Sequence, residues 1–286
     1  MLSVDSWVSS SLNVYAHRSW VVDSLFALLA RNDVLKGGAV ILFYSWAWFR
    51  RHVEIAEQRQ ILICGLIGGI VAPWVARLVA ITAPFRLRPL HNPALHWQLA
   101  YGTSPSTLLN WSSFPSDHAA MFAAFAMALF FVSRRAGIVL FAYVFALVDF
   151  ARIYLGLHYL TDILVGTLIG IAVAYLSISK GPRRLVLRHI MPVLDRRPEY
   201  FYPGFIFSLY MVGTMFGPLH EILRYLIVVS HAPSGHRFAA ILNSRWRPAF
   251  AGAALLVMLA FVLLEMLRGR STDHALASSP HDPKQA

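Results

Sequence analysis

The residues best suited to chemistry in this chain are Arg152, His158 and Asp162, which form the pattern Arg-x5-His-x3-Asp. Side chains four positions apart lie on the same face of a helix. A carboxylate in that position can hold an imidazole in one tautomer. The arginine adds a permanent cation, which an apolar helix does not carry without a reason.

Two further polar clusters precede this pattern. One is Phe-Pro-Ser-Asp-His at residues 114–118, and the other is Phe-Arg-Leu-Arg-Pro at residues 85–89. Phosphoryl transfer depends mainly on positioning and on cations that stabilise charge on the equatorial oxygens. Histidines, a carboxylate and several arginines on an otherwise apolar chain are therefore a plausible set for that reaction.

The cations and a helix start supply the expected phosphate site. Arg86, Arg88 and Arg152 can each donate bidentate hydrogen bonds to a phosphate. Pro115 fits the first turn of the helix that follows it, so the free amides of that helix point at the same place. Ser116 adds a hydroxyl donor.

The two histidines take complementary expected roles. His118 can protonate a leaving oxygen, and His158, held by Asp162, can attack phosphorus as a neutral imidazole. Each cluster also has an ordinary alternative: a structural histidine, arginines that reach toward lipid headgroups, or a histidine–aspartate metal site. Three clusters in this order favour catalysis over those alternatives.

Composition identifies the kind of protein that must position these groups. Of 286 residues, 57% are hydrophobic and 14% are charged, whereas a soluble domain has roughly a quarter of its residues charged. The mean hydropathy is +0.57. An integral membrane protein is therefore expected. The single cysteine, Cys64, lies in an apolar run and excludes a disulfide framework and a thiolate metal site.

Apolar runs near the roughly 20 residues that cross a bilayer recur along the chain. They cover residues 33–50, 60–80, 114–133, 137–153, 160–179, 201–219 and 249–267. Residues 1–32 carry valine and leucine at helical spacing and predict an interfacial amphipathic helix. The expected fold is an all-α, polytopic transmembrane helical bundle of about six to seven spans.

The expected organisation has five parts. They are the interfacial segment 1–32, a catalytic transmembrane core 33–180, a basic cytoplasmic loop 181–200, two additional C-terminal transmembrane helices within 201–267, and a disordered polar tail 268–286. The tail follows from its polar composition.

The formal charge of +11 has a distribution that argues against a nucleic-acid partner. Basic residues gather at 50–59, 134–136 and 180–198, after apolar runs. This is the bias of cytoplasmic loops, and basic surface alone does not indicate nucleic-acid binding. The segments 81–113 and 154–159 then lie on the opposite side, so the three polar clusters share one face of the membrane.

The motifs Arg-Pro at 88–89, Pro-Ser-x-His at 115–118 and Arg-x5-His-x3-Asp at 152–162 resemble the type-2 phosphatidic acid phosphatase superfamily, which also contains the vanadium haloperoxidases. The resemblance covers roughly residues 10–180. Within that family, residues 113–119 are similar to the bacitracin-resistance type of undecaprenyl pyrophosphate phosphatase.

The resemblance implies a role for each site residue. His158 would be the nucleophile, Asp162 its partner and His118 the general acid. The expected phosphate-binding residues are Arg86, Arg88, Ser116, Asp117 and Arg152. The family uses no metal and no other cofactor for this reaction, so neither is expected here.

The implied function is hydrolysis of a lipid phosphate or pyrophosphate through a phosphohistidine at the periplasmic face of a bacterial inner membrane. Undecaprenyl pyrophosphate is the first choice of substrate. Phosphatidic acid, phosphatidylglycerophosphate and lipid A, with hydrolysis or phosphate transfer, are the alternatives. A transporter or a non-catalytic lipid-binding protein is the alternative of another class. Membrane lipids are the other expected partners, and the oligomeric state stays open.

Three positions depart from the family pattern. The family's first motif opens with a lysine where this chain has Ile81, and Arg77 or Arg86 could replace that cation. Asp117 stands where the family has glycine, and a carboxylate there repels a phosphate unless it pairs with an arginine. Ala151 replaces a serine before the arginine of the last motif.

A second copy of one motif occurs late in the chain. Pro-Ser-Gly-His at 233–236 matches the family's second motif, but no Arg-x5-His-x3-Asp follows it. It lies in the basic loop 230–248, which does not fit the charge bias of the other loops. This copy is not expected to be catalytic.

Overall fold

The computed structural model describes residues 3–51 and 53–231, and every regular element in these ranges is a helix. The chain divides into two compact units at Pro192. The expected all-α architecture is confirmed for the described part of the chain. The motif copy at 233–236, the apolar run 249–267 and the tail 268–286 lie outside the described residues.

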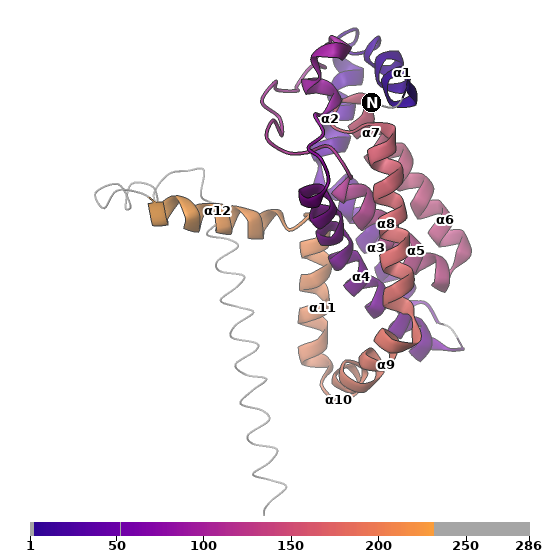
Figure 1. Ribbon diagram of the computed structural model, residues 1–286. Coiled ribbons are helices and arrows are strands. Elements are labelled where there is room, and N and C mark those ends of the chain that lie inside the picture. Colours follow the sequence, from indigo (N-terminus) through magenta and orange to yellow (C-terminus); the bar gives the residue numbers. More distant parts are fainter. Residues whose placement is uncertain (1–2, 52, 232–286) are drawn as a thin grey trace, which may run out of the picture. The chain divides into compact units, whose positions relative to one another are not determined.

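The centre of the first unit is formed by α4 (Ile55–Thr82), α5 (Asp117–Val132) and α8 (Leu160–Ile178), which pack against one another (Figure 1). Their shared core is made of alanines: Ala72, Ala76, Ala120, Ala124 and Ala174. Small residues let membrane helices approach closely, where dispersion forces act between the backbones. The bundle is therefore tight along the helices that carry the polar motifs.

One glycine shows how close this approach is. Gly166 of α8 lies against the backbone carbonyl of Ser116, so a Cβ at that position would overlap the carbonyl oxygen. An alanine would have to push α8 away from the start of α5. Gly166 therefore sets the spacing between two helix ends that both carry candidate site residues.

A second group of helices surrounds this bundle. A π-helical turn η1 (Val34–Gly38) leads into α3 (Ala39–Phe49), and α6 (Arg134–Tyr143) continues through a second π-helical turn, η4 (Val144–Asp149), into α7 (Phe150–Tyr154). Such turns occur often at functional sites. One holds Lys36, and the other ends three residues before Arg152.

Two helices form the N-terminal segment that was predicted as one interfacial helix. They are α1 (Ser3–Asn13) and α2 (Trp20–Arg31), separated by a turn at His17, where φ is 63°. Exposed aromatic side chains include Trp7 and Trp20, as expected for helices at a membrane interface.

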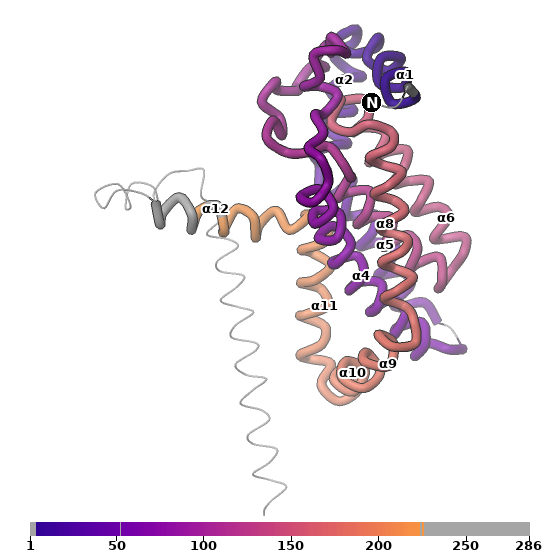
Figure 2. The backbone as a smooth tube through the Cα atoms, viewed as in Figure 1, coloured from indigo at the N-terminus to yellow at the C-terminus, as the bar shows by residue number. Residues whose placement is uncertain are grey.

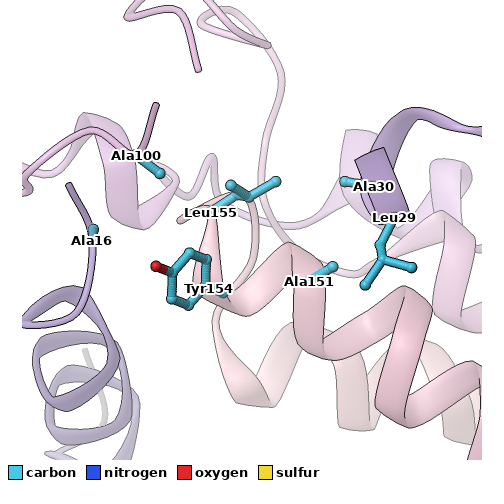
Figure 3. Packing of buried hydrophobic residues seen from close by; sticks show 7 residues of the cluster. All are labelled: Ala16, Leu29, Ala30, Ala100, Ala151, Tyr154 and Leu155. Atoms are coloured by element: carbon cyan, nitrogen blue, oxygen red, sulfur yellow. The ribbon is translucent and has the colours of Figure 1, made fainter. Parts of the chain in front are cut away.

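The inner side of this segment packs onto the end of α7. Figure 3 shows the buried cluster that joins them, with Leu29 and Ala30 from α2 beside Ala151, Tyr154 and Leu155. The N-terminal helices are thus part of the core near the candidate site.

Three described helices are long and apolar enough to cross a membrane: α4, the continuous helix Arg134–Tyr154, and α8. They correspond to three of the predicted spans. Two more predicted spans, 33–50 and 114–133, are the shorter apolar helices Val34–Phe49 and Asp117–Val132. The prediction of about six to seven spans is therefore higher than the number found in residues 3–51 and 53–231.

The predicted span 201–219 is broken. It falls on α11 (Pro198–Gly213) and α12 (Gly217–His231), and the pair formed by α11 and Gly217–Leu223 is bent by 82°. Met215 and Phe216 between them have φ of 51° and 57°. Left-handed backbone ends an α-helix, and hydropathy alone does not reveal such a turn. Counted as one span, this pair raises the total to four.

The basic segment 181–200 is also helical. It contains α9 (Lys180–His189) and α10 (Met191–Arg196). Val186 is buried, and Arg183 pairs with Glu57 of α4 at 2.7 Å. A connecting loop was predicted because charge dominates the segment, but arginine and leucine are good helix formers.

Candidate active site

A long loop, residues 83–116, returns from α4 to α5 at the end of the bundle where α1, α2 and α7 also lie (Figures 1 and 2). Backbone hydrogen bonds attach it on two sides. The amide of Ser113 donates to the carbonyl of Arg86 at 2.9 Å, and the amide of Ser116 donates to the carbonyl of Asp162 at 3.1 Å. The three polar clusters of the sequence therefore meet in one place.

The imidazole of His158 is buried and held in one tautomer. Its Nδ1 lies 2.7 Å from the carbonyl oxygen of Ser113. A carbonyl can only accept, so Nδ1 carries the hydrogen and Nε2 keeps its lone pair. That nitrogen lies 3.3 Å from Nη1 of Arg88. Burial lowers the pKa of His158, although the carboxylate of Asp162 acts against this shift. The result is a neutral imidazole whose orientation is fixed by this hydrogen bond.

Asp162 contributes differently from the expectation that it holds His158. Its Oδ2 lies 3.7 Å from Nδ1, too far for a hydrogen bond. That oxygen instead accepts from the amide of Tyr159 at 2.8 Å, which caps the start of α8. The other oxygen, Oδ1, accepts from Nη1 of Arg86 at 2.5 Å. The carboxylate thus supports the helix end and Arg86, and it influences His158 only through its charge.

Arg86 is held between two buried carboxylates. Besides its bond to Asp162, its Nη2 donates to Oδ2 of Asp5 at 2.6 Å, and its Nη1 donates to the hydroxyl of Thr161 at 2.9 Å. Both carboxylates have no solvent exposure. The ring of Tyr159 also contacts this side chain: the guanidinium carbon of Arg86 lies 4.2 Å from the ring centroid. Arg86, expected to bind phosphate, is therefore placed to position α1, the loop and α8.

The N-terminal helix takes part through Asp5. Its carboxylate accepts from the amide of Thr161 at 3.0 Å and from the hydroxyl of the same residue at 2.7 Å. Sequence reasoning did not include Asp5 in the site. The available signal was the repeat of Asp5, Ser9 and Asn13 at four-residue spacing, which places three polar side chains on one face of the helix.

Arg88 lies beside the imidazole of His158. Its Nε donates to the carbonyl of Trp111 at 3.2 Å, its Nη2 to the carbonyl of Ser112 at 3.1 Å, and its Nη1 to the carbonyl of Leu157. A guanidinium has five N–H groups, and these three carbonyls together with Nε2 of His158 account for four, so one is left for another acceptor. Burial lowers its pKa to about 10, which still leaves the group charged at neutral pH.

Arg152 is the least satisfied cation of the site. Its side chain is 5% exposed, and Nη1 is buried with no hydrogen-bond partner. Asp149, three residues earlier, is also buried, and its Oδ1 has no partner. A buried N–H group without a hydrogen-bond acceptor destabilises the folded protein. A bound anion that accepts from Arg152 would remove that cost.

Ser116 begins α5 as its N-cap. Its Oγ accepts from the amide of Ala119 at 3.3 Å, and the residue is fully buried. The helix starts at Asp117, so Pro115 precedes the helix instead of lying in its first turn. The hydroxyl hydrogen of Ser116 and the first amides of α5 are the groups that this end offers to an anion.

Asp117 and His118 form a pair at the start of α5. Asp117 Oδ1 lies 2.9 Å from Nδ1 of His118, so the carboxylate accepts from that nitrogen and leaves Nε2 free. Its Oδ2 pairs with Arg77 at 3.0 Å. The guanidinium carbon of Arg77 lies 4.2 Å from the centroid of Trp111. The negative charge that the sequence placed beside a phosphate site is therefore matched by an arginine.

The other two departures from the family pattern are Ile81 and Ala151. Ile81, where the family has lysine, is 74% exposed on α4, and Ala151 is buried in the cluster that joins α2 to α7. Within residues 3–51 and 53–231, no group of three or more histidine, cysteine, aspartate or glutamate side chains is arranged to hold a metal ion.

Comparisons with known proteins agree with the motifs. Residues 82–185 match the model of the PAP2 superfamily. The chain is 25% identical over 173 residues to undecaprenyl-diphosphatase BcrC of Bacillus subtilis (strain 168), an alignment that covers 59% of this chain and 80% of that relative. No solved structure matches the chain. The resemblance read from the motifs is confirmed, and together with the apolar helices it indicates a membrane phosphatase.

Proposed function

We propose that this protein hydrolyses a lipid phosphate or pyrophosphate through a phosphohistidine on His158. The observation that carries the proposal is the environment of Nε2 of His158: its lone pair faces Nη1 of Arg88 at 3.3 Å. Arg152, whose Nη1 has no hydrogen-bond partner, is the second cation at this end of the bundle. A phosphoryl group there would meet a neutral nucleophile and cations that stabilise its equatorial oxygens.

The reaction has two steps. In the first, the lone pair of Nε2 forms the N–P bond while the bond from phosphorus to the bridging oxygen breaks. His118 gives a proton to the leaving oxygen, which departs with the electron pair. In the second, His118 takes a proton from water, the water oxygen attacks phosphorus, and the N–P bond breaks. Phosphate leaves, and both histidines return to their starting states.

The contacts of each remaining site residue suggest its role in the reaction. Arg88, Arg152 and Ser116 would hold the phosphoryl oxygens, and the carboxylate of Asp117 would stabilise the charged form of His118. Asp162 and Arg86 would keep α8 and the loop in place. No step requires a metal ion, and we propose that the reaction is metal-independent.

Undecaprenyl pyrophosphate is the proposed substrate, with undecaprenyl phosphate and inorganic phosphate as products. The similarity to undecaprenyl-diphosphatase BcrC supports this choice. A pyrophosphate also has a better leaving group than a phosphate monoester, so it depends less on a full set of cations. The distribution of arginines favours a site on the periplasmic face of a bacterial inner membrane.

The test is phosphate release by the purified protein in detergent. Undecaprenyl pyrophosphate, phosphatidic acid and phosphatidylglycerophosphate are compared by kcat/KM. We expect the prenyl substrate to be preferred. A preference of about tenfold for either glycerolipid, roughly 1.4 kcal/mol in transition-state stabilisation, would overturn the prenyl assignment and leave the phosphatase assignment in place. Absence of turnover on every substrate would overturn both.

A further inference from the structure

Lys36 is a buried charge that the mechanism above does not use. It lies in η1, before α3, and it is 6% exposed. The chain has three lysines, Lys36, Lys180 and Lys284, and the other two lie far along the sequence. An ammonium group buried in a membrane protein is costly and usually functional. Lys36 falls inside the apolar run 33–50, apart from the three polar motifs.

The partner of Lys36 leaves it with free donors. Its Nζ pairs with Oδ1 of Asp33 at 3.1 Å, and the side chain of Asp33 is 49% exposed. An ammonium has three N–H groups. A half-exposed carboxylate on the same turn accounts for one of them, so Lys36 can bind a second anion without losing this pair.

The contacts of η1 link the segment around Lys36 to the segment around Arg152. The hydroxyl of Tyr143 donates to the carbonyl of Leu35 at 2.6 Å, and the side chain of Leu35 packs against the cluster that contains Ala151. η1 also contacts η4, which leads into α7. The residues next to Lys36 in sequence are therefore fixed against the residues next to Arg152.

The contacts of η4 also connect the segment around Lys36 to the helix of His118. Helix α5, which begins at Asp117, contacts η4, as η1 does. His118 is the proposed donor of a proton to the leaving oxygen, whereas Arg88 lies against the proposed nucleophile His158. In the arrangement proposed below, Arg88 serves the side of attack and Lys36 serves the side of departure.

The other cations that could serve the departing group are already paired. Arg77 bonds to Asp117, and Arg86 bonds to Asp5 and Asp162. Lys36 and Arg152, in contrast, both keep donors without a hydrogen-bond partner. Their ammonium and guanidinium groups form a site for an anion that sits beside the leaving oxygen.

We propose that Lys36 binds the phosphate of the leaving group, and so makes the site selective for lipid diphosphates over lipid monophosphates. This inference rests on the proposed function. When a diphosphate is cleaved, the bridging oxygen leaves as part of a lipid phosphate and gains negative charge beside the ammonium group. When a monoester is cleaved, the leaving oxygen belongs to an uncharged alcohol, so Lys36 has no anion to hold.

The experiment compares two substrates that share one tail, farnesyl diphosphate and farnesyl monophosphate. Lys36→Met is expected to lower kcat/KM for the diphosphate by tenfold or more and to change that for the monophosphate by less than threefold. Lys36→Arg should keep most of the wild-type selectivity, since it retains a cation. Lys180→Met removes an exposed lysine of α9 as the matched control and should leave both values unchanged.

Inhibition by inorganic ions provides a second readout. Lys36→Met should weaken competitive inhibition by inorganic pyrophosphate about tenfold, or roughly 1.4 kcal/mol, and leave inhibition by orthophosphate nearly unchanged. Elution volume and melting temperature in detergent confirm that each variant is folded.

The outcomes separate this inference from the proposed function. Equal losses on both substrates would overturn the selectivity role of Lys36, and so would unchanged values on both. In either case the wild-type protein still turns over, so the phosphatase assignment stands. If wild-type protein hydrolyses neither substrate, the proposed function fails and this inference fails with it.

Discussion

The backbone carbonyl of Ser113 accepts a 2.7 Å hydrogen bond from Nδ1 of His158. This contact selects the tautomer in which Nε2 carries a lone pair, and that lone pair faces Nη1 of Arg88. It comes from a loop 45 residues earlier in the chain. The orientation of the proposed nucleophile therefore depends on how residues 83–116 fold.

Replacing either histidine should separate their roles. His158→Ala is expected to abolish turnover, because no N–P bond can form. His118→Ala should slow turnover by about 10²–10⁴-fold, the usual contribution of a general acid. Phosphate release in a chelating buffer is the measurement, and vanadate should inhibit because its trigonal-bipyramidal form resembles the transition state. Activity that disappears in EDTA and returns with a divalent ion would contradict the metal-free mechanism.

Arg86→Met should destabilise the protein more than it weakens phosphate binding. The change leaves two fully buried carboxylates, Asp5 and Asp162, without their cation. Removing one partner of a buried ion pair typically costs about 3–5 kcal/mol. Thermal unfolding in detergent measures the loss, with Arg134→Met, an exposed position on α6, as control. If stability is unchanged while the inhibition constant of orthophosphate rises tenfold, Arg86 is a phosphate ligand after all.

The pair formed by Arg77 and Asp117 predicts two different kinetic defects. Asp117→Asn removes a charge-assisted hydrogen bond to His118, worth about 1.5–3 kcal/mol, so kcat should fall about ten- to a hundredfold. Arg77→Met exposes the phosphate to an unpaired carboxylate and should raise KM severalfold. The double variant should regain the wild-type KM, because no unpaired charge remains. A KM that stays high in the double variant would show that Arg77 itself binds substrate.

The pH profile of kcat/KM should have an acid limb below the ordinary range of histidine. Burial lowers the pKa of His158, and the nucleophile must be neutral. Activity is then constant as pH falls through about 6.5, the ordinary value, and declines only at lower pH. The same shift affects stability: the unfolded chain binds this proton more readily, so folding stability decreases as pH falls. If activity falls on acidification with a midpoint above pH 7 while the protein stays folded, a buried neutral His158 would be contradicted.

Labelling of single cysteines tests which side of the membrane holds the site. In a Cys64→Ala background, a cysteine in place of Pro105 should react with an impermeant reagent in intact cells. The reason is that 81–113 lies opposite to the basic segments. A cysteine in place of Ser179, before α9, should react only after lysis. The reverse pattern would place the site on the cytoplasmic face.

Hydropathy predicted the helices that form the bundle, because α4, the helix Arg134–Tyr154 and α8 are long and apolar. It could not reveal the break after Gly213, which depends on left-handed backbone at non-glycine residues. The predicted number of spans exceeds the number found in the described residues at this break and at the two shorter helices, and the predicted span 249–267 lies outside those residues.

Motif spacing predicted which residues meet, but not every contact among them. The spacing of His158 and Asp162 indicates that they are near each other, and they are. It cannot show that a backbone carbonyl competes for Nδ1, since Ser113 contributes no side chain to that bond. Asp5 and Lys36 were missed for another reason, namely that neither belongs to one of the three polar motifs, and each gains its meaning from contacts in the folded chain.

The bond between Asp5 and Thr161 joins residues 156 positions apart. Thr161 is therefore synthesised 156 residues after Asp5, when α3 to α7 have already been made. During biosynthesis Asp5 has no Thr161 to bind until the start of α8 is made, so this side of the site forms late. A bulky group attached to α1 beside Asp5 would interfere at that last stage.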